Sequence, residues 1–63
     1  MEYTMIIIEY LATDRLTFEE IAPSEDIARM KARRTSKVKR LGVTSFRFVD
    51  GKGREVFRKK VDK

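Results

Sequence analysis

The stretch Pro-Ser-Glu-Asp-Ile-Ala-Arg-Met at residues 23–30 shows where a helix begins in this 63-residue chain. Proline disfavours helical backbone at the residue before it, so it separates what precedes it from a helix that follows. Ser24 can accept hydrogen bonds from the free N–H groups of a helix start, and Glu25 and Asp26 lie where the helix dipole favours negative charge. The stretch therefore predicts a helix that begins at about Ser24.

The predicted helix extends to Lys39 or Leu41. Gly42 follows it as the residue that would take the left-handed conformation common just after a helix. Positive side chains dominate its later turns, where the negative end of the dipole favours them. They are Arg33, Arg34, Lys37, Lys39 and Arg40.

Residues 2–11 read Glu-Tyr-Thr-Met-Ile-Ile-Ile-Glu-Tyr-Leu, rich in strand-forming tyrosine and isoleucine. Both alternating sets are apolar, which is typical of a strand that is central in its sheet or covered on both sides. After the polar turn at residues 12–15, residues 16–22 allow two interpretations. Their alternation favours a second strand paired with the first, while Thr17 and Glu20 have capping-box spacing and could begin a helical turn that Pro23 ends. We favour the strand.

Downstream of the helix, residues 43–49 have strand composition, and Asp50-Gly51-Lys52-Gly53 contains the Asp-Gly pair typical of tight hairpins. Residues 54–61 form the predicted return strand. The predicted fold is a single α+β domain over residues 1–63. It is a small two-layer sandwich of ββαββ order, or βαββ if residues 16–22 are not a strand, with an antiparallel sheet and one helix across one face.

Apolar alternation assigns a helix-facing side to each strand. The core would contain Phe46, Phe48 and Phe57 together with Ile6, Ile8, Tyr10, Leu16 and Phe18. In the last strand, Glu55, Lys59 and Val61 share the face of Phe57. The opposite sheet face would carry Arg47, Arg54, Arg58 and Lys60 beside Tyr3, Met5 and Ile7. Phe46 and Phe48 share one face and could form a base-stacking platform, but so short a chain can hardly spare them from its core.

The predicted helix has an apolar face formed by Ile27, Met30, Val38 and Leu41, with Ala28 on its flank. Lys31 and Arg34 fall in the middle of this face. Their aliphatic stems could extend past a thin core to water, or their charges could pair with Glu9 or Glu55 of the sheet. Alternatively, the helix ends near Ser36 and residues 36–42 form a basic loop.

Composition excludes several classes of function. The chain has no cysteine and no histidine, so disulfides, thiolate zinc sites and the commonest general base are absent. No acid–base constellation, calcium loop or phosphate loop is present, and we therefore expect neither an enzyme nor a cofactor. The longest apolar run, residues 5–8, is far too short to span a membrane, and no secretory signal precedes it. We expect a cytoplasmic protein that does not contact membranes.

Charge is distributed unevenly along the chain. Residues 1–28 hold seven acids and one base, a net of −6, and residues 29–63 hold fourteen bases and three acids, a net of +11. Such an asymmetry predicts either a partner of opposite charge or internal pairing of the two halves. Our first hypothesis is that the basic half binds DNA or RNA through phosphates. Its candidate residues are Arg29, Arg33, Lys37, Lys39 and Arg40 on the helix, and Arg47, Arg58 and Lys60 on the sheet.

The alternative hypothesis is a homodimeric protein-interaction or inhibitor module. Its interface would be the apolar sheet face around Tyr3, Met5 and Ile7, because one helix cannot cover both sides of the first strand. In size, charge and lack of catalytic groups, the chain resembles small phage- or plasmid-type accessory proteins in general. That resemblance implies no particular site residue.

Overall fold

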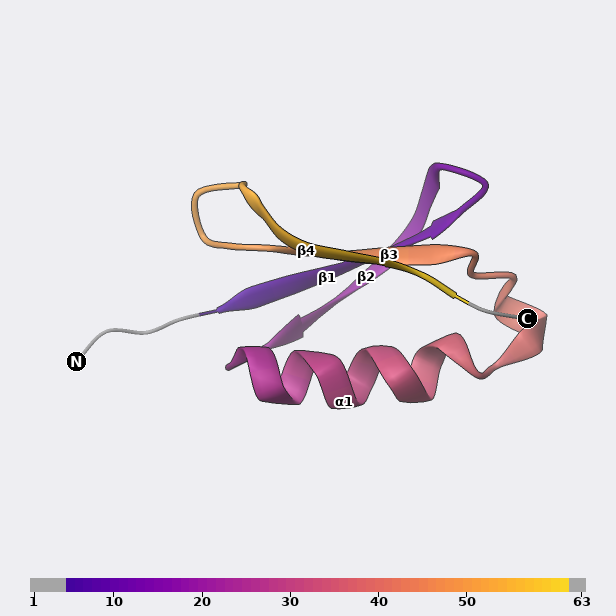
Figure 1. The fold of residues 1–63 in the computed structure, drawn as a ribbon, viewed down its shortest axis with the longest axis horizontal. Coiled ribbons are helices and arrows are strands. Elements are labelled where there is room, and N and C mark those ends of the chain that lie inside the picture. The colour runs from indigo at the N-terminus through magenta and orange to yellow at the C-terminus, as the bar shows by residue number, and fades with distance from the viewer. Residues whose placement is uncertain (1–4, 62–63) are drawn as a thin grey trace.

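The computed structural model describes residues 5–61 as a sheet with one helix beneath it (Figure 1). The four strands are antiparallel in the order β2-β1-β3-β4, and the helix covers one face. This confirms the ββαββ two-layer sandwich and the strand at residues 16–22; the alternative of a helical turn there is wrong. The elements are β1 (Ile6–Ala12), β2 (Arg15–Ala22), α1 (Glu25–Ser36), the 3-10 turn η1 (Lys39–Leu41), β3 (Ser45–Val49) and β4 (Glu55–Lys60).

The first hairpin turns through Thr13 and Asp14, both in the left-handed region with φ of 51° and 65°. Two such residues make the tight turn whose twist matches that of the flanking strands. A bulge then shifts the register, so that Tyr10 lies opposite Phe18 but Leu11 lies opposite Leu16. The extra residue, Thr17, donates its hydroxyl to the Tyr10 carbonyl at 3.0 Å.

The bulge corrects the predicted core at one position. Leu16 was expected beneath the helix, but its pairing with Leu11 directs it away, and it is 56% exposed. A period-2 pattern carries no sign of a bulge, because the inserted residue leaves the composition unchanged.

The core lies between the helix and the aromatic side chains of the sheet. Ile8, Tyr10 and Phe48 are fully buried, and the Phe46 and Phe48 rings stack with their centroids 5.6 Å apart. From the helix, only Ala28 and Ala32 are buried. Their small side chains let the backbone approach the sheet, whose large rings fill the space between the layers. Phe46 and Phe48 are therefore core residues, not a base-stacking platform.

The predicted helix end at Lys39 or Leu41 is wrong, because α1 ends at Ser36, and its buried face also differs from the prediction. Ser24 caps it as predicted, but it ends at Ser36, after which Val38 is extended and Gly42 ends η1 instead of α1. Thus the basic loop over residues 36–42 is the interpretation that the structure supports. The predicted apolar face is wrong, since Met30 is 58% exposed while Ala28 and Ala32 are buried.

The two cations expected on that face do not pair with the sheet carboxylates. Lys31 donates its ammonium to the Ile21 carbonyl at 2.9 Å, and Arg34 is exposed. Glu9 and Glu55 instead bind Arg47 of β3. Neither cation is buried, because the alanine line that faces the core lies beside them.

The second hairpin also contains a bulge, between Phe48 and Val49, which places Glu55 opposite Val49. Glu55 was expected on the helix-facing side with Phe57, but it contacts Arg47 and Arg58 on the other side. Arg54, expected on that open face, lies in the turn before β4 and binds Asp50 at 3.2 Å.

Within residues 5–61, neither helix has the length and apolar character needed to cross a membrane.

Candidate nucleic-acid interface

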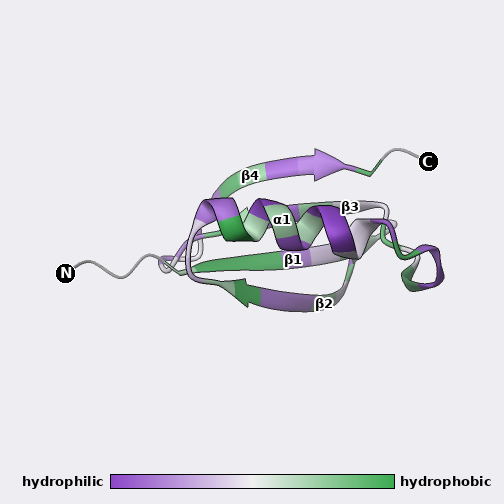
Figure 2. Cartoon of the chain, turned by 90° about the horizontal axis from the view of Figure 1, so that it is seen from below, coloured by the Kyte–Doolittle hydropathy of each residue, from purple (hydrophilic) through white to green (hydrophobic). Residues whose placement is uncertain are grey.

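A groove opens beside the helix because α1 packs mainly on β1 and β2 and does not cover the end of β4 at Lys59 and Lys60 (Figure 2). It has a volume of about 710 Å³ and lies between the end of α1, the loop that follows it, and strands β3 and β4. The lining residues are Arg33, Ser36, Lys37, Val38, Lys39, Gly42, Val43, Phe46, Lys59, Lys60 and Val61.

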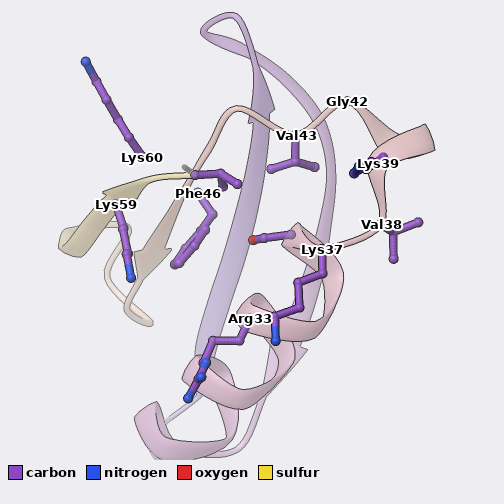
Figure 3. A pocket seen from close by; sticks show the side chains of 11 residues that line it. Arg33, Lys37, Val38, Lys39, Gly42, Val43, Phe46, Lys59 and Lys60 are labelled. Atoms are coloured by element: carbon purple, nitrogen blue, oxygen red, sulfur yellow. The ribbon is translucent and has the colours of Figure 1, made fainter. Parts of the chain in front are cut away.

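Five of the lining residues are cations, and none of the lining residues within 5–61 is an acid. Two chain segments far apart in sequence contribute them. In Figure 3, Arg33 and Lys37 lie on the helix side, and Lys59 lies across from them on β4, with Phe46 between. Lys60 lines the groove only at its edge, because its side chain extends away from the other cations, on the side of β4 that carries Arg58. None of the five forms an ion pair with any residue of the described chain. Their charges are therefore available to an anion. The five are Arg33, Lys37, Lys39, Lys59 and Lys60.

The floor of the groove is apolar. Val38 and Val61 are half-buried, while Val43 and Phe46 are each 6% exposed and belong to the core. Aliphatic and aromatic walls lower the local dielectric response, so the charges above them act more strongly on an anion than they would on a flat wet surface.

Helix electrostatics explain some of these cations but not all. Arg33 is in the last turn of α1, where a positive charge is favourable beside the free carbonyl groups. Lys59 and Lys60 come from β4 and have no such reason to be there. Helix stability therefore accounts for the cations at the end of α1 but not for the lysines of β4 that line the same groove.

The remaining predicted helix cations lie outside the groove. Arg29 pairs with Glu25 at 2.8 Å, and its guanidinium sits over the Phe57 ring, 4.9 Å from the centroid. Arg40 is exposed in η1 and does not line the groove. Arg29 thus stabilises the contact between the helix and β4 by a cation–π interaction.

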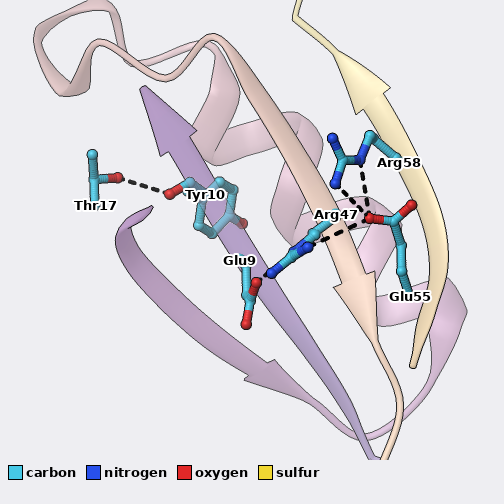
Figure 4. A network of polar contacts seen from close by, with 6 residues as sticks. All are labelled: Glu9, Tyr10, Thr17, Arg47, Glu55 and Arg58. Atoms are coloured by element: carbon cyan, nitrogen blue, oxygen red, sulfur yellow. Dashed lines mark hydrogen bonds and ion pairs between the residues drawn. The ribbon is translucent and has the colours of Figure 1, made fainter. Parts of the chain in front are cut away.

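On the open face of the sheet, the predicted cations Arg47 and Arg58 are neutralised by acids (Figure 4). Arg47 donates to Glu9 at 2.5 Å and lies 3.6 Å from Glu55, and Arg58 pairs with Glu55 at 2.7 Å. The Arg58 guanidinium lowers the pKa of Glu55, and the hydrogen bond to Glu9 raises the pKa of Arg47. Both arginines are thus held as ion pairs, and the open face is not a continuous positive surface.

Sequence reasoning missed Lys59. It was placed on the helix-facing side with Phe57, where a cation needs a way out to water. The position of Lys59 could have predicted the groove, because a cation on the helix-facing side of a strand indicates that the helix does not cover that part of the strand.

The three residues of the alternative interface are only partly described. Tyr3 lies outside the described residues, Met5 is 42% exposed and Ile7 is half-buried. Ile7 pairs with Ile21 and Val49 across the sheet, on the face away from the helix.

Within residues 5–61, no group of three ligating side chains could hold a metal ion. No protein-family model, curated protein or solved structure significantly matches this chain.

Proposed function

We propose that this protein binds DNA or RNA through phosphates held in the basic groove. The supporting observation is that Arg33, Lys37, Lys39 and Lys59, with Lys60 at the edge, line one groove, and that within the described residues they form no ion pair and no acid lies in the lining. Phosphate contacts of this kind give affinity without reading sequence, since they recognise the backbone that all sequences share.

The proposed site is smaller than the one suggested by the sequence. It keeps Arg33, Lys37, Lys39 and Lys60 and adds Lys59. Arg29, Arg47 and Arg58 are engaged by acids, and a phosphate would have to displace a carboxylate to reach them. The binding energy is therefore expected to come from the groove.

The salt dependence of binding tests this proposal. Labelled single- and double-stranded DNA and RNA are titrated at several salt concentrations, and binding is followed by fluorescence anisotropy. If all five cations contact phosphates, log K falls against log salt with a slope of about −4.5 on duplex or about −3.5 on single strands. Absence of binding to every probe at low salt would refute the proposal.

A pair of charge-matched variants locates the site. Lys37→Gln/Lys59→Gln removes one cation from each side of the groove and is expected to weaken binding about tenfold or more and to flatten the salt slope by about two phosphate contacts. Arg15→Gln/Lys52→Gln removes the same charge from two exposed positions in the hairpins and serves as the control. Equal losses in both variants would show that net charge, not the groove, determines binding.

A further inference from the structure

The open face of the sheet carries a row of four charges, one from each strand. The register pairs Glu19 of β2 with Glu9 of β1, Glu9 with Arg47 of β3, and Arg47 with Arg58 of β4. Read across the sheet from β2 to β4, the signs are minus, minus, plus, plus. No described element covers this row, because the only long helix lies under the other face (Figure 1).

Within one molecule this order leaves like charges side by side. Glu9 and Glu19 are directly opposite cross-strand neighbours, as are Arg47 and Arg58, and such pairs are destabilising. Glu55 lies between the two arginines and relieves them. Glu19 is exposed and forms no ion pair with any described residue, so the acidic end of the row has no comparable relief.

The row is self-complementary under a two-fold axis. If the axis lies in the plane between two stacked sheets and runs along the strands, it reverses the row of the second molecule. Minus, minus, plus, plus then faces plus, plus, minus, minus, and each charge meets its opposite. An axis across the strands would instead place like charges over one another, so only one of the two in-plane arrangements is favourable.

The neighbouring row is apolar and remains in register under the same axis. Ile21, Ile7 and Val49 occupy successive strands β2, β1 and β3. The rotation places Ile7 of each molecule over Val49 of the other, and Ile21 over the β4 end of the row, where Glu55 lies opposite Val49. Ile21 is 55% exposed in the single molecule, so a second sheet stacked about 10 Å away would remove apolar surface from water.

We infer that the open sheet face is the interface of a symmetric homodimer, in which two copies stack face to face with parallel strand directions. Glu19 of each copy lies over Arg58 of the other at the two ends of the row, and at the centre of the neighbouring row Ile7 packs on Val49 of the other copy. This isologous arrangement closes after two copies, so it does not lead to filaments. The groove, on the helix side of the sheet, stays accessible in each copy.

Charge reversals in the full chain test the arrangement by sedimentation equilibrium. Glu19→Arg and Arg58→Glu each create two like-charge contacts at the ends of the row, and each is expected to raise the dimer dissociation constant at least about tenfold. In an equimolar mixture of the two variants, all four positions of the row are again opposite in sign. The mixture is therefore expected to form a heterodimer under conditions in which each variant alone is monomeric.

Two controls keep the test decisive. Asp26→Arg makes the same change in charge on the helix layer and is expected to leave the dimer unaffected. Glu19→Arg also replaces a like-charge neighbour of Glu9 by an opposite one, so the fold of the monomer is not weakened. A wild-type chain that stays monomeric at several hundred micromolar would overturn the inference, as would a mixture that remains monomeric although both variants are folded.

Discussion

At the scale of single residues, Tyr10 links the two layers of the fold. Its ring is fully buried, and its hydroxyl donates a hydrogen bond to the Glu20 carboxylate at 2.6 Å. The Thr35 hydroxyl of the helix donates to the same oxygen at 3.0 Å. Burial is the main cause of a strongly raised Tyr10 pKa, and the bond to Glu20 adds to it.

The raised pKa predicts a loss of stability at alkaline pH. Above the unfolded value of about 10, the unfolded chain releases the phenol proton while the folded chain retains it, so rising pH favours unfolding. Tyr10→Phe is expected to cost about 1 kcal/mol at neutral pH, because one hydrogen bond to Glu20 is lost. Since phenylalanine does not titrate, the stability difference between wild type and variant should close by about pH 11.

Urea unfolding of both proteins between about pH 8 and pH 11 measures this difference. All other ionisable groups are common to the two proteins, so their contributions cancel in the comparison. A difference that stays constant over the whole range would contradict the burial of a neutral phenol at position 10.

Residue types alone could not show which arginines are free. Arg47 and Lys59 look alike in the sequence, as cations of a strand that lie within two residues of a phenylalanine. Arg47 faces Glu9, 38 positions earlier in the chain, whereas Lys59 forms no ion pair within the described part of the molecule. That difference depends on β1 and β3 being neighbours, which no local pattern encodes.

At the scale of elements, the start of the helix follows from local chemistry and its end does not. Ser24 accepts from the Ile27 N–H at 3.3 Å, as a serine before two acids predicts. The end at Ser36 depends on tertiary packing, because Val43 must reach the core and the chain has to turn at Val38 to bring it there. The same division holds for the strands. Their positions follow from the composition of each segment, but both bulges depend on how neighbouring strands pair.

Ser24 is expected to contribute measurably to stability through its cap. Ser24→Ala should lower the free energy of unfolding by about 1 kcal/mol, because an N–H at the helix start loses its acceptor. In a domain of this size that corresponds to a melting temperature about 4–8 °C lower. Ser24→Asp keeps an acceptor and should melt close to the wild type. If aspartate were as harmful as alanine, the side chain would act through packing and not as a cap.

At the scale of the whole molecule, the fold pairs some of the acids and bases of the two halves on the open sheet face and leaves other cations without an ion pair beside the groove. Strand pairing brings acidic Glu9 against basic Arg47 and uses those charges on the open face. The cations that strand pairing does not engage include the five around the groove, beside the helix end. The net charge of +5 was evident from composition, but its separation into a paired face and a basic groove required the sheet order.

A groove that holds five like charges must destabilise the free protein, and this gives a prediction that separates function from folding. Lys37→Gln/Lys59→Gln should stabilise the free chain, because it relieves repulsion across the groove while weakening nucleic-acid binding. The expected gain is about 0.5 kcal/mol, or about 2–4 °C in melting temperature at low salt. It should shrink as added salt screens the repulsion.

The control Arg15→Gln/Lys52→Gln lowers the net charge equally, but at positions well separated from the groove. It should change the melting temperature much less, since its two cations do not face each other across a shared cavity. Thermal unfolding of wild type and both variants at two salt concentrations makes the comparison. A groove variant no more stable than the control would mean that the five cations do not repel one another appreciably. The groove would then lack the concentrated positive potential on which phosphate binding depends.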